Sequence, residues 1–167
     1  VNLSDTNVLN GSISLSADTS IAVNAGSLIL SGSVDGAYGL TKTGTGILQL
    51  TAANTYTGPT ILSAGTLLLK GGNDRLGTGA ITVQSGLLDL GGWTQNTAVQ
   101  VSLQSGTIQN GTLSSSLNST SAFAAQSGVI SASLKGIGGL TKTTAGELVL
   151  LGDNSNRVEG VNYRHED

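Results

Sequence analysis

The side chains that most often carry enzymatic or metal chemistry are scarce in this chain. Its 167 residues contain no cysteine and one histidine, His165, near the C-terminal end. A catalytic triad needs a base beside its nucleophile, and a zinc site needs several His, Cys or Asp ligands at short spacing. We therefore expect no catalytic residue, no metal site and no cofactor, and we interpret His165 as an exposed residue.

Paired carboxylates are the remaining route to chemistry, because two acids about 5–9.5 Å apart suffice to cleave a glycosidic bond. The acids inside the repeat are Asp18, Asp35, Asp74, Asp89 and Glu147. Asp89 and Glu147 take outward positions three periods apart in the repeat described below, a separation of roughly 15 Å. The other three fall in expected turns. We predict that the chain is not an enzyme.

Four residues are candidates for ligand contact. Trp93 and Tyr56 are expected in loops, where an aromatic ring can stack on a sugar or simply cover the end of a coil. Lys42 and Lys142 recur in T-K-T segments at positions expected to face outward. They could contact anionic glycans or keep an exposed sheet soluble. With a net charge of −3 and no basic stretch, a nucleic-acid partner is not expected.

A repeat of about 20 residues must position these side chains. Glycines preceded by Ala, Ser or Thr and followed by alternating apolar residues recur at intervals of 18 to 22 residues. They are Gly26, Gly46, Gly65, Gly86, Gly106, Gly128 and Gly146. Apolar residues or threonine also lie five and three positions before each glycine. A period of two on both sides indicates strands with one buried face, and the glycine supplies the sharp turn between them.

Periods of this length are typical of solenoids. A leucine-rich repeat would need a helical return, whereas each unit here carries two strand patterns and no helical spacing. We therefore predict an all-β, right-handed parallel β-helix of about eight coils, with Leu28, Leu48, Leu67 and Leu88 stacked one above another. The other eight or so residues of each unit are polar and variable. Among them Asn54, Asn73 and Asn154 suit turns or a stacked amide ladder.

Residues 39–69, GLTKTGTGILQLTAANTYTGPTILSAGTLLL, resemble the passenger-associated transport repeat of bacterial autotransporters. Residues 87–113 resemble the segment that commonly follows, and GLTKTTAGELVLLGDNSN at 139–156 starts a second copy. The resemblance implies a right-handed β-helix from the passenger of a type V secretion protein. It also implies a longer chain with a signal peptide before this segment and its own outer-membrane β-barrel after it.

Two parts of the chain differ in pattern. Residues 1–152 are predicted to be the β-helical segment of a larger passenger, and the charged residues 153–167 a frayed or non-native tail. The predicted function is a structural stem that supports export and display at the surface of a Gram-negative bacterium. The alternatives are an adhesin that binds host glycan or protein or self-associates, and a polysaccharide-active enzyme, which the scattered acids disfavour.

Overall fold

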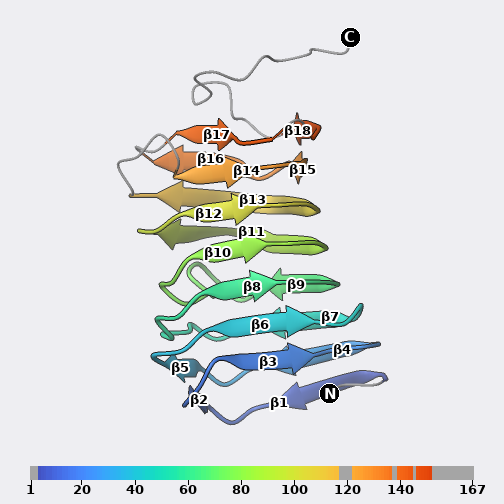
Figure 1. Cartoon of the computed structure of the whole chain (residues 1–167). Helices are drawn as coiled ribbons and strands as arrows, with labels where there is room; N and C mark the ends of the chain where they lie inside the picture. The colour runs from blue at the N-terminus through green and yellow to red at the C-terminus, as the bar shows by residue number, and fades with distance from the viewer. Residues whose placement is uncertain (1–3, 117–121, 137–138, 145, 152–167) are drawn as a thin grey trace.

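The computed structural model describes residues 4–116, 122–136, 139–144 and 146–151, and in them the chain is all β. Strands stack in successive coils along one axis (Figure 1). No helix long and apolar enough to cross a bilayer occurs in these ranges. The predicted parallel β-helix is confirmed.

Each coil contributes one strand to a front sheet of seven strands and one to a side sheet. The front sheet consists of β3 (Thr19–Ala22), β6 (Leu40–Thr43), β8 (Thr60–Leu62), β10 (Ile81–Val83), β12 (Val101–Leu103), β14 (Phe123–Ala125) and β17 (Leu140–Lys142). The side sheet stacks β1 (Thr6–Leu9), β4 (Ser27–Leu30), β7 (Ile47–Leu50), β9 (Thr66–Leu69), β11 (Leu87–Thr97), β13 (Thr107–Ser115), β15 (Gly128–Ile130) and β18 (Leu148–Leu150). Eight side-sheet strands one coil apart enclose seven full turns.

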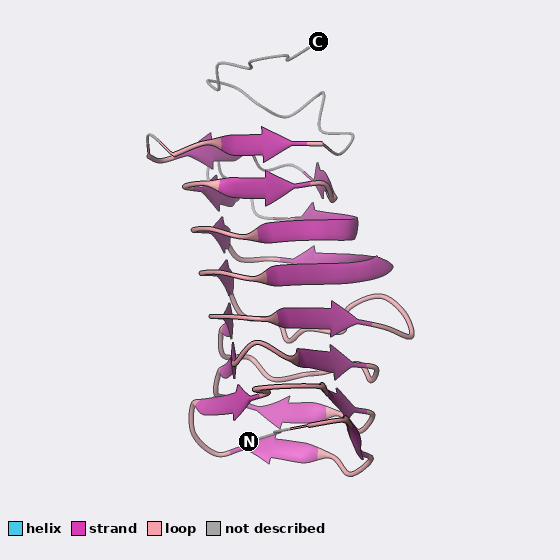
Figure 2. Cartoon of the chain, turned by 90° about the vertical axis from the view of Figure 1, so that its right-hand side faces the viewer, coloured by secondary structure: helices cyan, strands magenta, loops and turns pink. Residues whose placement is uncertain are grey.

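All neighbouring strands run parallel, and they pair in register except for one shift between β11 and β13, between Asp89 and Trp93. In Figure 1 the front strands run from left to right, and β11 and β13 return along the far side as the chain rises toward its C-terminal end. The coil is therefore right-handed. The view in Figure 2 shows the same stack from the side sheet.

The predicted aliphatic column is present. Leu28 pairs with Leu48, Leu48 with Leu67, and Leu67 with Leu88, and the column continues through Ile108 and Ile130. Leu48, Leu67 and Leu88 are almost completely buried. Fully burying one leucine contributes about 1.5–3 kcal/mol, so neighbouring coils stabilise one another through this column.

A stack of glycines forms the corner between front and side sheets. Gly26, Gly65, Gly86, Gly106 and Gly128 have positive φ, as the sequence predicted for the turn, whereas in the corner of Gly46 the positive φ belongs to Gly44 instead. A Cβ atom on Gly86 would lie 2.3 Å from the carbonyl oxygen of Gly65 in the coil below. Glycine is therefore required twice here, by its backbone conformation and by the close approach of the next coil.

Each coil also has a third side, where the sequence predicted only variable turns. Strands β2 (Ile13–Leu15) and β5 (Val34–Gly36) pair there, and further along the axis β16 (Ser133–Gly136) pairs with the second half of β13. Strands β11 and β13 bend and contribute residues 93–97 and 111–115 to this side. Asp35 lies inside β5, so its prediction as a turn residue was wrong.

Candidate functional site

Lys42 faces the interior, which overturns its prediction as an outward ligand-contact residue. It lies in β6 between Ile21 of one neighbouring coil and Leu62 of the other, and only 1% of its surface is exposed. Its Nζ atom donates to the carbonyl oxygens of Thr43 at 2.8 Å, Gly44 at 2.7 Å and Ala64 at 3.1 Å. All three protons of the ammonium group therefore have acceptors inside the fold.

Lys142 occupies the equivalent position at the C-terminal end of the front sheet, where it pairs with Ala125. Its side chain is half-buried, and its Nζ atom donates to the carbonyl oxygen of Gln126 at 3.2 Å and to that of Thr144. Its prediction as an outward-facing residue is thus wrong in the same way as that of Lys42, although its amine group is still accessible to solvent.

Tyr56 is fully buried, so it does not contact a ligand and its prediction is also wrong. Its hydroxyl group shares a 2.6 Å hydrogen bond with Oγ1 of Thr60 at the start of β8. Its ring packs under Gly77, where a Cβ atom would come within 2.6 Å of the ring. Burial raises the pKa of the Tyr56 hydroxyl group above its ordinary value.

Trp93 is the predicted ligand-contact residue that stays at the surface. It lies in β11 rather than in a loop, directly after the bend at Gly91 and Gly92, and 42% of its surface is exposed. The indole packs beside Gly91 and faces solvent on its other side. Nothing in the structure assigns it a ligand, so its role stays a prediction.

Two of the acids, Asp89 and Asp74, form hydrogen bonds with neighbouring residues of the fold. Asp89 accepts hydrogen bonds from the Gly91 backbone and from the side chains of Gln109 and Asn110. Asp74 accepts from the backbone and the side chain of Asn96. Within the described residues, no three His, Cys, Asp or Glu side chains are grouped so that they could hold a metal ion.

The recurring asparagines connect coils instead of stacking on one another. Oδ1 of Asn54 accepts from the Val34 backbone at 2.7 Å, and its Nδ2 donates to the Arg75 carbonyl oxygen at 2.5 Å, so one buried side chain bridges three successive coils. Asn73 accepts from the backbone of Thr94. These amides replace backbone bonds where the third side lacks regular strands. Asn154 lies outside the described residues.

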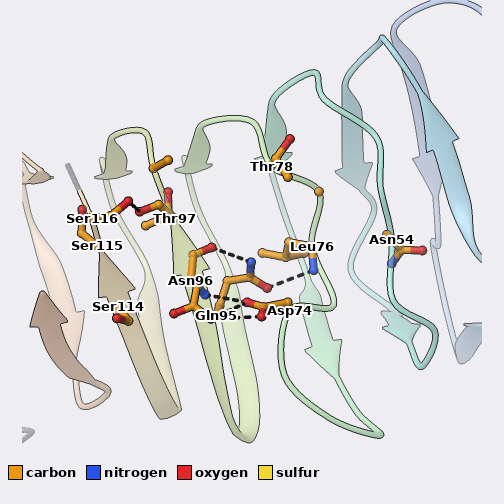
Figure 3. A pocket seen from close by; sticks show the side chains of 12 residues that line it. Asn54, Asp74, Leu76, Thr78, Gln95, Asn96, Thr97, Ser114, Ser115 and Ser116 are labelled. Atoms are coloured by element: carbon orange, nitrogen blue, oxygen red, sulfur yellow. Dashed lines mark hydrogen bonds between the residues drawn. The ribbon is translucent and has the colours of Figure 1, made fainter.

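A groove of about 460 Å³ crosses the third side. Two of its lining residues, Gln95 and Asn96, follow Trp93 closely in the sequence. Asp74, Gln95 and Asn96 lie together on its floor, and Ser114–Ser116 line it on the next coil (Figure 3). Gln95 accepts from the Leu76 backbone and donates to the Asn96 carbonyl oxygen. The polar groups on the floor thus bond mainly to one another, and this hydrogen bonding stabilises the third side.

One segment of the β-helix matches a known family of sequence repeats. Residues 40–69 match the family model described as passenger-associated-transport-repeat. Residues 40–69 are thus similar to a passenger-associated transport repeat. Neither the curated proteins nor the solved structures contain a significant match.

The matched segment begins in β6 and ends in β9, so it covers one complete coil and then the front strand, the corner and the side strand of the next coil. Lys42, Asn54 and Tyr56 all lie within it, and all three face the interior. The resemblance stated for residues 39–69 is confirmed over the matched range. The second copy expected at 139–156 lies outside that range and stays a prediction.

The buried lysine of the transport repeat makes stability depend on pH. Burial lowers the pKa of Lys42 from its ordinary 10.5 to about 8, because it disfavours the charged form. Between these two values the folded chain has released a proton that the unfolded chain still holds. Stability therefore rises with pH across this window.

We expect the free energy of unfolding of the wild type, relative to Lys42→Met, to increase by about 1–2 kcal/mol between pH 7 and 9.5, since one pKa unit corresponds to about 1.4 kcal/mol. Denaturant unfolding of both proteins at the two pH values measures this difference. A difference that stays constant would show that Lys42 titrates as it does in the unfolded chain.

Proposed function

We propose that this chain is a stem segment of a secreted or surface-displayed autotransporter passenger from a Gram-negative bacterium, supporting export and display. The observation that carries the proposal is a transport repeat built into an uninterrupted β-helix. Its interior is a continuous aliphatic column, and within the described residues no metal-binding cluster interrupts the stack.

The physical role follows from how the coils depend on one another. A single coil cannot bury its own apolar face, so each new coil gains its stability by stacking on its neighbour. A segment that folds in this way outside the membrane opposes return of the chain through it. The finished rod then holds the rest of the passenger away from the cell surface.

Removal of one complete coil tests the stem proposal. Deletion of residues 66–86 joins Gly65 to Leu87, which pairs with Thr66 one coil below, so the register of the stack is kept. Deletion of 66–76 removes about half a coil and turns inward residues outward. In the full-length passenger, we expect the first deletion to preserve surface display, measured by cleavage with added protease, and the second to abolish it. Equal display of both would contradict a role for stacking.

Adhesion is the second function that we propose, and the exposure of Trp93 favours it. An aromatic ring with one open face can stack on a host glycan or insert into a protein partner or a second copy of the chain. Binding to glycan arrays and host cells should fall in Trp93→Ala and persist in Tyr38→Ala, which removes another exposed aromatic ring. Equal binding by both variants would leave Trp93 without a role in adhesion.

A further inference from the structure

The two corners that follow a lysine are longer than the corners of the four coils that lie between them. Strand pairing defines which residues occupy equivalent positions on either side of the corner in each coil. Three residues lie between Leu62 and Thr66, and three between their equivalents Val83 and Leu87. In the next two coils the equivalent gaps, 103–107 and 125–129, also contain three residues. Four residues separate Lys42 from Ile47, and six separate Lys142 from Val149.

A longer corner leaves room that must be filled. In the first coil, five residues separate Ile21 from Ser27, and the buried side chain of Val23 occupies the space. In the next coil the space is filled by an amine group. This difference matters because a valine donates no hydrogen bond, whereas the Lys42 amine group donates to the carbonyl oxygens of Gly44 and Ala64 and is a second donor to that of Thr43, which also accepts from the Val23 backbone.

The oxygens around Lys42 form a cradle that suits a primary ammonium ion. Two come from its own corner, Thr43 and Gly44, and the third comes from Ala64 in the following coil. Gly44 has a φ of +75°, which directs the backbone into this arrangement. A Cβ atom on Gly65 would lie 2.9 Å from the lysine Nζ atom and 2.4 Å from the Gly44 carbonyl oxygen. The absence of a side chain at Gly65 therefore keeps the cradle open.

Lys142 repeats the arrangement in a second G-L-T-K segment, a hundred residues later. Its amine group also binds the carbonyl oxygen two residues ahead, that of Thr144, and one from an adjacent coil, that of Gln126. Two copies of one motif thus place an amine group at the same corner and connect it to a neighbouring coil.

We propose that the corner after each G-L-T-K segment is a binding site for a primary amine group, which the lysine of the motif occupies from within the chain. The amine group donates hydrogen bonds to the carbonyl oxygens of the corner. It thereby connects two coils between the front and side sheets, where no strands pair. The cradle made by Thr43, Gly44 and Ala64 then accepts a free alkylammonium ion when the Lys42 side chain is removed. This inference does not depend on what the stem displays.

Chemical rescue of Lys42→Ala tests the site. The variant leaves a cavity and removes the amine donor from the carbonyl oxygens of Gly44 and Ala64, and we expect its melting temperature to fall by roughly 6–12 °C. Propylammonium chloride should restore a large part of the loss in Lys42→Ala and leave the wild type unchanged. Propanol, which has a similar size but no charge, and sodium chloride at equal ionic strength should not. Rescue by propanol as strong as by propylammonium, or no rescue at all, would overturn the proposal.

A second measurement uses the wild type and remains valid if the variant fails to fold. Limited acylation of the folded protein with an amine-reactive reagent should modify the exposed Lys70 and Lys135 at least about tenfold faster than Lys42, since an amine group held by three carbonyl oxygens must be released before it can react. Peptide mapping gives each rate within one sample. Equal rates at Lys42 and Lys70 would show that the cradle does not hold the amine group.

Discussion

Replacing Leu67 by alanine is expected to lower the free energy of unfolding by about 2–5 kcal/mol, the range found when a buried leucine is truncated. Leu67 lies in the middle of the aliphatic column, between Leu48 and Leu88. It is almost fully buried, so its truncation leaves a cavity between three coils. Urea unfolding followed by circular dichroism measures the loss.

The adjacent residue provides a matched control. Leu68 has the same side chain but points outward from β9, between Gln49 and Asp89 in the neighbouring strands. We expect Leu68→Ala to cost less than about 1 kcal/mol, because outward truncation leaves no enclosed cavity. Equal losses at both positions would contradict the assignment of inward and outward faces.

A methyl group at Gly86 is expected to destabilise the stack by at least about 2 kcal/mol. Its φ of +90° is strained for alanine, which alone costs about 1–3 kcal/mol. The new Cβ atom would also lie 2.3 Å from the carbonyl oxygen and 3.0 Å from the nitrogen of Gly65. Neither contact can be relieved without separating two coils. The midpoint of thermal unfolding reports the change.

Gly92→Ala separates strain from collision. Gly92 has a similar φ of +86°, but no atom lies within 4 Å of the position of its Cβ atom. The loss of stability in Gly92→Ala should therefore come from backbone strain alone. Equal stability of Gly86→Ala and Gly92→Ala would contradict the claim that neighbouring coils approach closely at the glycine corner.

The fold was predictable from the sequence because its main determinants are periodic. Alternation with a period of two indicated strands, and glycines about 20 residues apart indicated one turn per coil. The stacking of Leu28, Leu48, Leu67 and Leu88 followed from that spacing and is confirmed. Repetition averages out local irregularities, which makes such a column easier to predict than any single turn.

Lys42 was placed on the wrong face because of one extra residue. Counting back five and three positions from Gly46 selects Thr41 and Thr43 as inward residues, whereas Leu40 and Lys42 are the buried ones. The corner before β7 is one residue longer than the corner before β9, and a shift of one residue exchanges the two faces of a strand. A charged residue in the interior also contradicts the usual expectation for lysine.

Tyr56 and the third side were misread for a different reason. Polar residues without alternation predict turns, yet residues 54–57 run along the third side and bond to β5 through the backbone nitrogens of Thr55 and Thr57. Buried amide side chains supply donors and acceptors there, so the segment needs little apolar patterning. A partner such as Thr60 for the Tyr56 hydroxyl group becomes visible only once the coils are stacked.

Disulfide trapping tests the central claim that these residues form stacked, in-register coils. The chain has no cysteine, so two can be introduced without interference. Gln49 and Leu68 are paired in adjacent coils, whereas Gln49 and Asp89 lie two coils apart on the same outer row. Adjacent strands are about 4.8 Å apart, within disulfide range, and strands two coils apart exceed the limit of about 7 Å. We predict rapid oxidation of Gln49→Cys/Leu68→Cys and none of Gln49→Cys/Asp89→Cys, and equal oxidation of both pairs would contradict the stacked coil.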